Sequence, residues 1–126
     1  MTAVVYDTGV LIAADRNGRR VWADHRVRLE RGIVPIVPAP VVAQASRSPR
    51  QAQLRRLLRG CDVVALDEAG AHQAGALLGK AGTDDICDAV VVAVAARIGA
   101  EVVTSDRNDI RRLVSAARRR IPIIDL

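Results

Sequence analysis

Short β-branched runs alternate with helix-length segments along the whole chain, and this alternation limits the folds open to it. The runs are too short for helices and are rich in Val and Ile, as strands are. Ser48 with Pro49, and Thr83, supply helix-starting signals between them. The pattern predicts an α/β protein, a three-layer α/β/α sandwich around a largely parallel sheet. Strands are expected at residues 2–6, 33–37, 63–66, 101–104 and 121–124, and helices at residues 8–14, 20–31, 41–46, 49–58, 68–78, 84–98 and 107–119.

The core has to be aliphatic, because the 126-residue chain contains no Phe and only 2% aromatic residues. Half of the residues are nevertheless hydrophobic, so Val, Leu, Ile and Ala have to fill the interior. This composition suits a parallel sheet that is covered by Ala-rich helices. At this length, and without a linker or an internal repeat, a single domain spanning residues 1–126 is expected.

Several classes of protein are disfavoured. No apolar stretch reaches the roughly 18 residues of a membrane span, and the N-terminus lacks the basic and apolar regions of a signal peptide. Cys61 and Cys87 are too far apart for a CxxC unit, so a zinc site is not expected. Free thiols fit a reducing compartment, which predicts a cytoplasmic protein. His25 and His72 both lie in helical surface patterns, which disfavours nucleophilic catalysis.

The basic residues are almost all arginine: of 19, only Lys80 is a lysine, and the net charge is +5. Such a surface favours a polyanion such as RNA or DNA, because binding releases counterions from the phosphate backbone. An alternative is that a GC-rich genome favours arginine and that these side chains simply solvate helix faces. The composition leaves both interpretations open. The arginines cluster within residues 16–20, 47–59 and 111–120.

Three apolar runs end on or beside an aspartate. Asp7 ends the first strand, Asp106 follows the strand at residues 101–104, and Asp88 lies in the first turns of the most hydrophobic helix. In parallel α/β folds the carboxyl ends of strands and the amino ends of helices meet at one edge of the sheet. Three carboxylates at that edge would form a negative, oxygen-rich pocket of the kind that binds Mg²⁺ or Mn²⁺. The spacing therefore predicts metal-dependent chemistry on phosphate.

Each aspartate also has a structural interpretation. Acidic residues near helix N-termini interact favourably with the helix dipole, and Asp106 with Asp109 forms a capping-box-like pair. We favour such capping roles for Asp84 and Asp109, with an inward orientation as the alternative for Asp109, because it lies three residues after Asp106. Asp7 and Asp88 are different, because they lie beside the core, where an unpaired carboxylate is costly and no cationic partner is evident. A bound metal is the economical interpretation of these positions.

Three segments of the chain carry these aspartates in a specific order. They are VVYDTGVLIA at residues 4–13, DICDAVVVA at residues 85–93 and VVTSDRNDI at residues 102–110. Together they resemble the motifs of the PIN-domain ribonucleases, and within these the small VapC-type toxins of bacterial toxin–antitoxin pairs. Each segment alone is a weak signal, but the three in this order and within this length are rather specific. The resemblance covers nearly the whole chain.

The resemblance implies a Mg²⁺ or Mn²⁺ site, cleavage of RNA phosphodiester bonds, a homodimer and a small inhibitory antitoxin. It makes Asp7, Asp88 and Asp106 catalytic and metal-binding residues, matching three of the family's four acidic positions. The hydroxyl groups of Thr8 and Thr104 would orient these carboxylates. Hydrolysis would proceed without a covalent enzyme intermediate.

The fourth acidic position of the family, a Glu on the short helix after the second strand, is Gln44 in this chain. An amide oxygen can coordinate a cation but brings no charge, so it would attract the metal less strongly. Asp85 is expected to compensate as a further metal ligand, because it precedes Asp88 by three residues and would share its helix face. The departure affects the expected activity and not the expected fold.

Two further interpretations stay open. A PIN-like domain that has lost catalysis, and that binds RNA or a protein partner, would account for Gln44. A phospho-receiver domain also gathers acidic residues at one edge of an α/β sheet. That domain needs a lysine at the end of a late strand, whereas Lys80 is expected in a loop. With few aromatic residues, RNA would be selected by shape and phosphate geometry more than by base stacking.

Overall fold

A parallel five-stranded sheet forms the centre of the computed structural model, which describes residues 2–126. The strand order is β3-β2-β1-β4-β5 and each neighbouring pair is parallel, so β1 lies in the middle of the sheet. The predicted α/β sandwich with a largely parallel sheet is confirmed. The strands are β1 (Val4–Tyr6), β2 (Ile36–Pro38), β3 (Asp62–Val64), β4 (Glu101–Thr104) and β5 (Ile123–Asp125).

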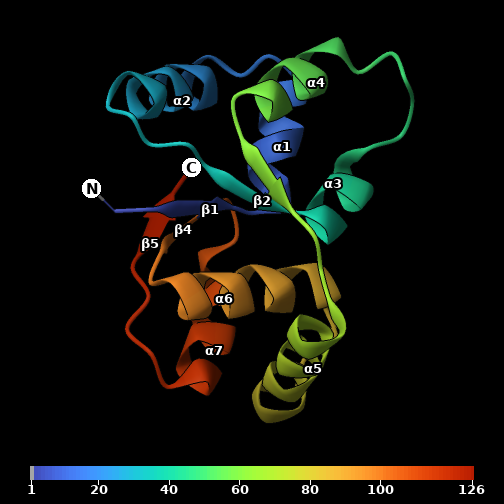
Figure 1. The fold of residues 1–126 in the computed structure, drawn as a ribbon, viewed down its shortest axis with the longest axis vertical. Coiled ribbons are helices and arrows are strands. Elements are labelled where there is room, and N and C mark those ends of the chain that lie inside the picture. The colour runs from blue at the N-terminus through green and yellow to red at the C-terminus, as the bar shows by residue number, and fades with distance from the viewer. Residues whose placement is uncertain (1) are drawn as a thin grey trace.

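The helices form two layers, one on each face of the sheet (Figure 1). The helices α1 to α4 lie on one face and α5 to α7 on the other. Within residues 2–126 none of these helices has the length and apolarity that a membrane span requires. The helices are α1 (Thr8–Asp15), α2 (Arg19–Glu30), α3 (Ala39–Ala45), α4 (Ala52–Arg59), α5 (Glu68–Ala81), α6 (Ile86–Ile98) and α7 (Arg107–Ala117).

Helix α6 is the most deeply buried helix described. It packs against β1, β2 and β4 on one side and against α5 and α7 on the other. Residues 88–95 are all buried, which explains why this stretch is almost entirely Val and Ala. The helix ends at Gly99, whose φ of 71° lies in the left-handed region that glycine adopts without strain. Burial of α6 carries one acidic residue, Asp88, into the edge of the core.

The start of α4 differs from the prediction. The sequence predicts a helix from Pro49, but α4 begins at Ala52, after a turn. The side chain of Gln51 accounts for the turn, because its Oε1 accepts hydrogen bonds from the backbone N–H groups of Arg47 (2.6 Å) and Ser48 (3.0 Å). Local side-chain bonds of this kind compete with helical ones.

The region between α5 and α6 also differs. Lys80, expected in a loop, lies in the last turn of α5, which continues to Ala81 before Gly82 ends it. Thr83 does not cap α6. The capping residue is Asp85, whose carboxylate accepts the N–H of Asp88 at 3.0 Å, so α6 begins two residues later than predicted.

The sequence pattern predicts that His25 lies at the surface, and this prediction is wrong. His25 is 3% exposed because it lies on the side of α2 that faces the sheet, where its ring bonds to the hydroxyl of Tyr6. His72 is exposed, as expected. Cys61 and Cys87 are free and partly buried, which agrees with the prediction.

Candidate metal centre

Two neighbouring strands deliver Asp7 and Asp106 to the same edge of the sheet. β1 pairs directly with β4, with Tyr6 opposite Val103, and the Asp7 N–H donates to the Val103 carbonyl at 3.1 Å. Asp7 therefore leaves the sheet beside the segment that leads to Asp106. The segments predicted to meet at this edge do meet there.

Thr104 connects these two segments through its hydroxyl group. The hydroxyl donates a hydrogen bond to Oδ2 of Asp7 and accepts one from the backbone N–H of Asp106 at 2.9 Å. Thr104 is 0% exposed, so neither bond competes with water. The hydroxyl links the Asp7 carboxylate to the turn before α7.

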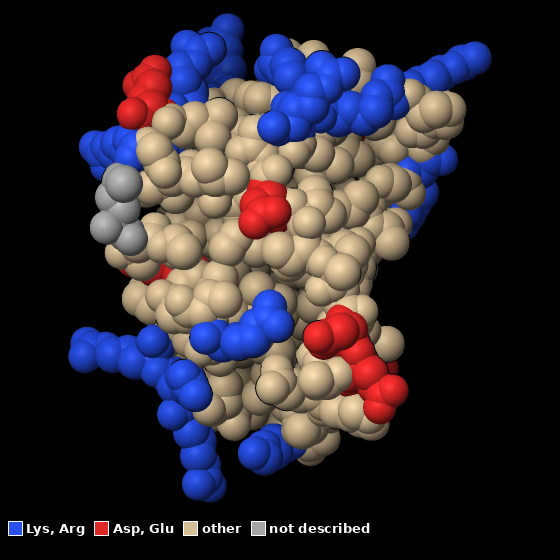
Figure 2. All heavy atoms as spheres, in the orientation of Figure 1, with Lys and Arg blue, Asp and Glu red and all other residues tan. Residues whose placement is uncertain are grey.

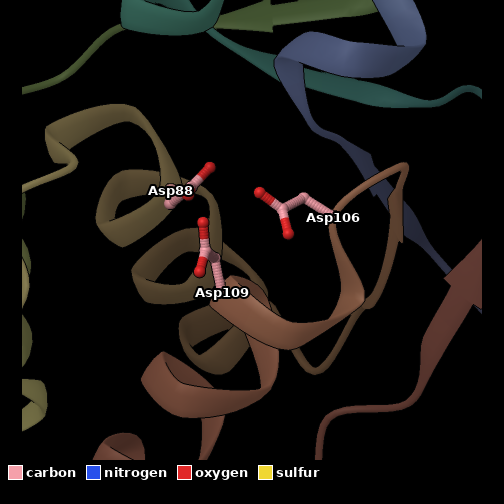
Figure 3. A group of neighbouring side chains, drawn as sticks. All are labelled: Asp88, Asp106 and Asp109. Carbon is pink, nitrogen blue, oxygen red and sulfur yellow. The ribbon is translucent and has the colours of Figure 1, made fainter.

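Three carboxylates from two helical segments point toward one another (Figure 3). Asp88 comes from the first turn of α6, Asp106 from the turn before α7, and Asp109 from the first turn of α7. One oxygen of each lies within 4.8 Å of an oxygen of the other two. Asp88 is 8% exposed whereas Asp106 and Asp109 are exposed, so the group opens to solvent on one side.

Asp7 lies beside this group and is not a member of the closest triplet. It is 4% exposed, and its burial raises the pKa of its carboxyl group. The hydrogen bond from Thr104 and the backbone N–H groups of Thr8 and Gly9 act in the opposite direction and stabilise the ionised form.

The electrostatics of Asp88 show how the carboxylates act on one another. Burial raises the pKa of Asp88 to about 7, and the charges of nearby carboxylates push it the same way. Those charges belong to Asp7, Asp85, Asp106 and Asp109. The pKa of Asp109 is also raised, by its hydrogen bond with Asp106 and by the charge of that residue. The group therefore carries more negative charge than its surroundings compensate.

The donor set fits a hard divalent cation. Among residues 2–126 the ion pairs are Arg20–Asp24, His72–Glu68 and Arg107–Asp125, and none involves an aspartate of this group. Carboxylate oxygens a few ångströms apart, with one buried and one open side, are the ligands that Mg²⁺ and Mn²⁺ prefer. Asp88, Asp106 and Asp109 are placed to hold such an ion, with Asp7 adjacent.

Two acidic residues differ from their expected positions. Asp85 does not share a helix face with Asp88; it precedes α6 and uses its carboxylate to cap the Asp88 N–H. Asp109 was expected to cap, but Asp106 at the start of α7 makes no side-chain capping bond, and Asp109 turns toward Asp88 instead. Its spacing of three residues from Asp106 had left this inward orientation open as the alternative.

Gln44 lies beside Thr8, the residue that follows Asp7. Its Oε1 accepts a hydrogen bond from the Thr8 hydroxyl at 2.8 Å, across a separation of 36 residues. The Thr8 hydroxyl therefore donates to Gln44 and not to the Asp7 carboxylate. Gln44 lies on α3 and is an exposed residue.

An open parallel sheet with carboxylates at the carboxyl ends of its strands defines the class of protein, an α/β protein with an acidic ligand site at one sheet edge. A sequence profile of the PIN domain family matches residues 4–115, and the chain belongs to this family. The resemblance inferred from the sequence motifs is thereby confirmed. PIN domains are generally nucleases.

Solved structures share this fold at low sequence identity. A chain of DNA-bound VapBC from Salmonella typhimurium has a TM-score of 0.71 and 17% identity, with 99% of this chain and 98% of that chain covered. A chain of VapBC2 from Rickettsia felis, bound to a promoter DNA fragment, has a TM-score of 0.69 and 13% identity, with 98% of both covered. A chain of FitAcB from Neisseria gonorrhoeae has a TM-score of 0.67 and 15% identity, with 96% of both chains covered. No significant match was found among curated protein sequences.

Proposed function

We propose that this protein is a metal-dependent endoribonuclease that hydrolyses RNA phosphodiester bonds and acts as the toxin of a toxin–antitoxin pair. The observation that carries the proposal is the convergence of Asp88, Asp106 and Asp109 within 4.8 Å, beside the buried Asp7. Membership of a family that consists generally of nucleases supports the reaction class.

The residues that would hold a Mg²⁺ or Mn²⁺ ion are Asp88 and Asp106, with Asp109 and Asp7 completing the set. The chemistry that such an ion supplies when bound is acidification of a water molecule and stabilisation of negative charge at phosphorus. The protein's own part is to fix the ligands: Thr104 orients Asp7 and holds the turn that carries Asp106. Without a cation, the raised pKa of Asp88 leaves a proton on its carboxyl group in part of the molecules near neutral pH.

The arginine-rich surface supports a nucleic-acid substrate. Lys and Arg side chains gather over the face where α2 and α4 lie (Figure 2). Phosphate contacts of this kind position a nucleic acid without reading its sequence. The arginines of these two helices are Arg19, Arg20, Arg26, Arg28, Arg55, Arg56 and Arg59.

The partner is proposed from the structural neighbours. VapBC from Salmonella typhimurium and from Rickettsia felis were solved bound to DNA. We extend the toxin–antitoxin assembly to this chain, with a small antitoxin that inhibits it and with a homodimer as its own assembly. A short gene directly upstream that encodes a DNA-binding protein would support the pairing.

A second candidate is a PIN domain that binds RNA or a protein partner without cleaving RNA. Gln44 favours this candidate, because it leaves an uncharged amide next to Thr8 where the family has its fourth carboxylate. A phospho-receiver function is not supported, since Lys80 lies in α5 and not at a strand end.

The test is cleavage of a mixed RNA pool by the purified protein with Mn²⁺ or Mg²⁺, and with EDTA. Cleavage should require the cation and should be lost in Asp88→Asn and Asp106→Asn. Asp84→Asn is the matched control, because Asp84 is an exposed aspartate outside the carboxylate group and should behave as wild type. Mn²⁺ and RNA binding without cleavage would favour the binding module, and cleavage that persists in EDTA would contradict the metal-dependent mechanism.

A further inference from the structure

Gly9 packs against Ser105 so closely that no other residue fits without movement. A Cβ added at Gly9 would lie 2.0 Å from Oγ and 3.0 Å from Cβ of Ser105. The backbone of Gly9 is not in the left-handed region, which the described glycines at positions 32, 82 and 99 adopt. The space beside Ser105, and not the backbone conformation, is therefore what favours glycine at this position.

The contact lies between the two segments that build the metal centre. Gly9 is the second residue of α1 and comes two residues after Asp7, whereas Ser105 directly precedes Asp106. Thr104 links the same two segments from inside through its hydroxyl group. The Gly9–Ser105 contact limits their approach from the outside.

We propose that Gly9 is a positioning residue of the metal centre, whose missing Cβ lets the start of α1 approach the turn between β4 and α7 at the separation that the ligands require. This inference rests on the proposed metal-dependent function. It adds a residue that bears no ligand atom and that has no role assigned to it, although it lies within the first motif segment.

The effect of Gly9→Ala on the metal centre depends on how far the added methyl group displaces Ser105. Rotation of the Ser105 side chain can move Oγ away from a new methyl group at Gly9, but Cβ of Ser105 stays at 3.0 Å. Relief of that contact needs a shift of a few tenths of an ångström. A fold tolerates such a shift, whereas metal–ligand distances are held to about 0.2 Å, and Mg²⁺ demands near-ideal octahedral geometry. Gly9→Ala should therefore weaken metal binding more than it lowers the stability of the fold.

A matched control separates this effect from the general effect of replacing glycine in a helix. Gly75 lies inside α5, and an added Cβ there meets no atom within 4 Å. Alanine is the better helix former at both positions, so neither Gly9→Ala nor Gly75→Ala should lower stability through helix propensity. Only Gly9→Ala introduces a contact with a segment of the metal centre.

The experiment measures the Mn²⁺ dissociation constant of the full chain by titration calorimetry, together with the melting temperature in EDTA. The variants are Gly9→Ala, Ser105→Gly, the double variant and Gly75→Ala. Gly9→Ala should weaken Mn²⁺ binding about tenfold or more. Ser105→Gly removes the atoms that the new methyl group would meet, so the double variant should return to within about threefold of wild type. Gly75→Ala should bind as wild type does.

The outcomes are distinct. Wild-type affinity in Gly9→Ala, or a loss that Ser105→Gly does not restore, would overturn the role of Gly9 while leaving the metal centre in place. Absence of Mn²⁺ binding in the wild type would instead overturn the proposed function. If Gly9→Ala fails to fold, a folded double variant with wild-type affinity supports the contact, and an unfolded double variant contradicts it.

Discussion

Tyr6 and Asp7 are consecutive, are both buried, and begin two polar clusters of opposite character. The Tyr6 hydroxyl bonds to Nδ1 of His25 at 2.8 Å and accepts a hydrogen bond from Arg28 at 3.2 Å, both on α2. Asp7 instead lies near Asp88 of α6, on the other face of the sheet (Figure 1). Asp7 directly follows β1 and keeps an extended backbone, and successive side chains of an extended backbone point to opposite faces, which explains the separation.

The two clusters differ in how their polar groups are satisfied. Around Tyr6 donors face acceptors: Arg28 donates to the Tyr6 oxygen, and the Tyr6 hydroxyl is free to donate to Nδ1 of a neutral His25. Burial raises the pKa of Tyr6 to about 12 and lowers that of His25, so both stay uncharged. The cluster around Asp7 and Asp88 contains an excess of acceptors. The first cluster pairs donors with acceptors within the protein, whereas the second would need a cation to balance its carboxylates, as the proposed function requires.

The strongest test of this difference is Asp88→Asn. It removes one carboxylate from the crowded group with little change in volume, so the apo protein should melt at the same or a higher temperature. Mn²⁺ should no longer raise the melting temperature, and RNA cleavage should fall by about 100-fold or more, a loss of roughly 2.7 kcal/mol in transition-state stabilisation. Thermal melts with and without Mn²⁺, and a cleavage assay, provide the measurement. A variant that unfolds, or that keeps the wild-type melting shift, would contradict the role of Asp88.

Tyr6→Phe tests the cluster around Tyr6. The substitution leaves Nδ1 of the buried His25 without its partner and should reduce the free energy of unfolding by about 1–3 kcal/mol. Urea unfolding gives the loss of stability. The Mn²⁺ affinity should be unchanged, because the Tyr6 side chain lies on the opposite face from the carboxylates. A parallel loss of Mn²⁺ affinity would show that the two clusters are not independent.

The pH dependence of stability should have opposite signs in the two clusters. The folded-state pKa of His25 is lowered from 6.5, so its stabilising contribution is present above about pH 6.5 and is lost as the pH falls. The pKa of Asp88 is raised to about 7, so its contribution is present at low pH and is lost as the pH rises through about 7.

Urea unfolding in EDTA between about pH 5 and about pH 8 measures both effects. His25→Gln should remove the decrease in stability that accompanies acidification, and Asp88→Asn should remove the decrease in stability as the pH rises toward about 7. His72→Gln serves as the control, because His72 is exposed and pairs only with Glu68 on its own helix. Identical profiles for wild type and both cluster variants would refute the opposite signs.

The smallest effect is expected for Gln44→Glu. The new carboxylate can still accept the Thr8 hydroxyl and adds one negative charge with almost no change in volume, so stability should change by less than about 0.5 kcal/mol. The concentration of Mn²⁺ that gives half-maximal cleavage should decrease. Equal half-saturation for both proteins would mean that Gln44 lies outside the metal centre, and would leave Asp109 to complete the ligand set.

The strands and the buried helix were predictable because their signals are local. β-Branched runs identified β1 and β4, and the apolar stretch after Asp88 identified α6. The direction of polar side chains was less predictable, since it depends on contacts between distant segments. Asp85 caps α6 because its carboxylate accepts the N–H of Asp88. His25 is buried where its ring forms a hydrogen bond with the hydroxyl of Tyr6 on β1. Neither the cap formed by Asp85 nor the burial of His25 can be predicted from the spacing of residues within one segment.

The direct pairing of β1 with β4 has a consequence for synthesis of the chain. Thr104 and Asp7 are hydrogen-bonded across a sequence separation of 97, and Asp109 comes later still. A ribosome releases the N-terminal elements first, so a nascent chain carries Asp7 for most of its elongation without the strand that completes the centre. The carboxylate group is therefore among the last features to assemble, because a chain that ends before β4 lacks Asp106 and Asp109.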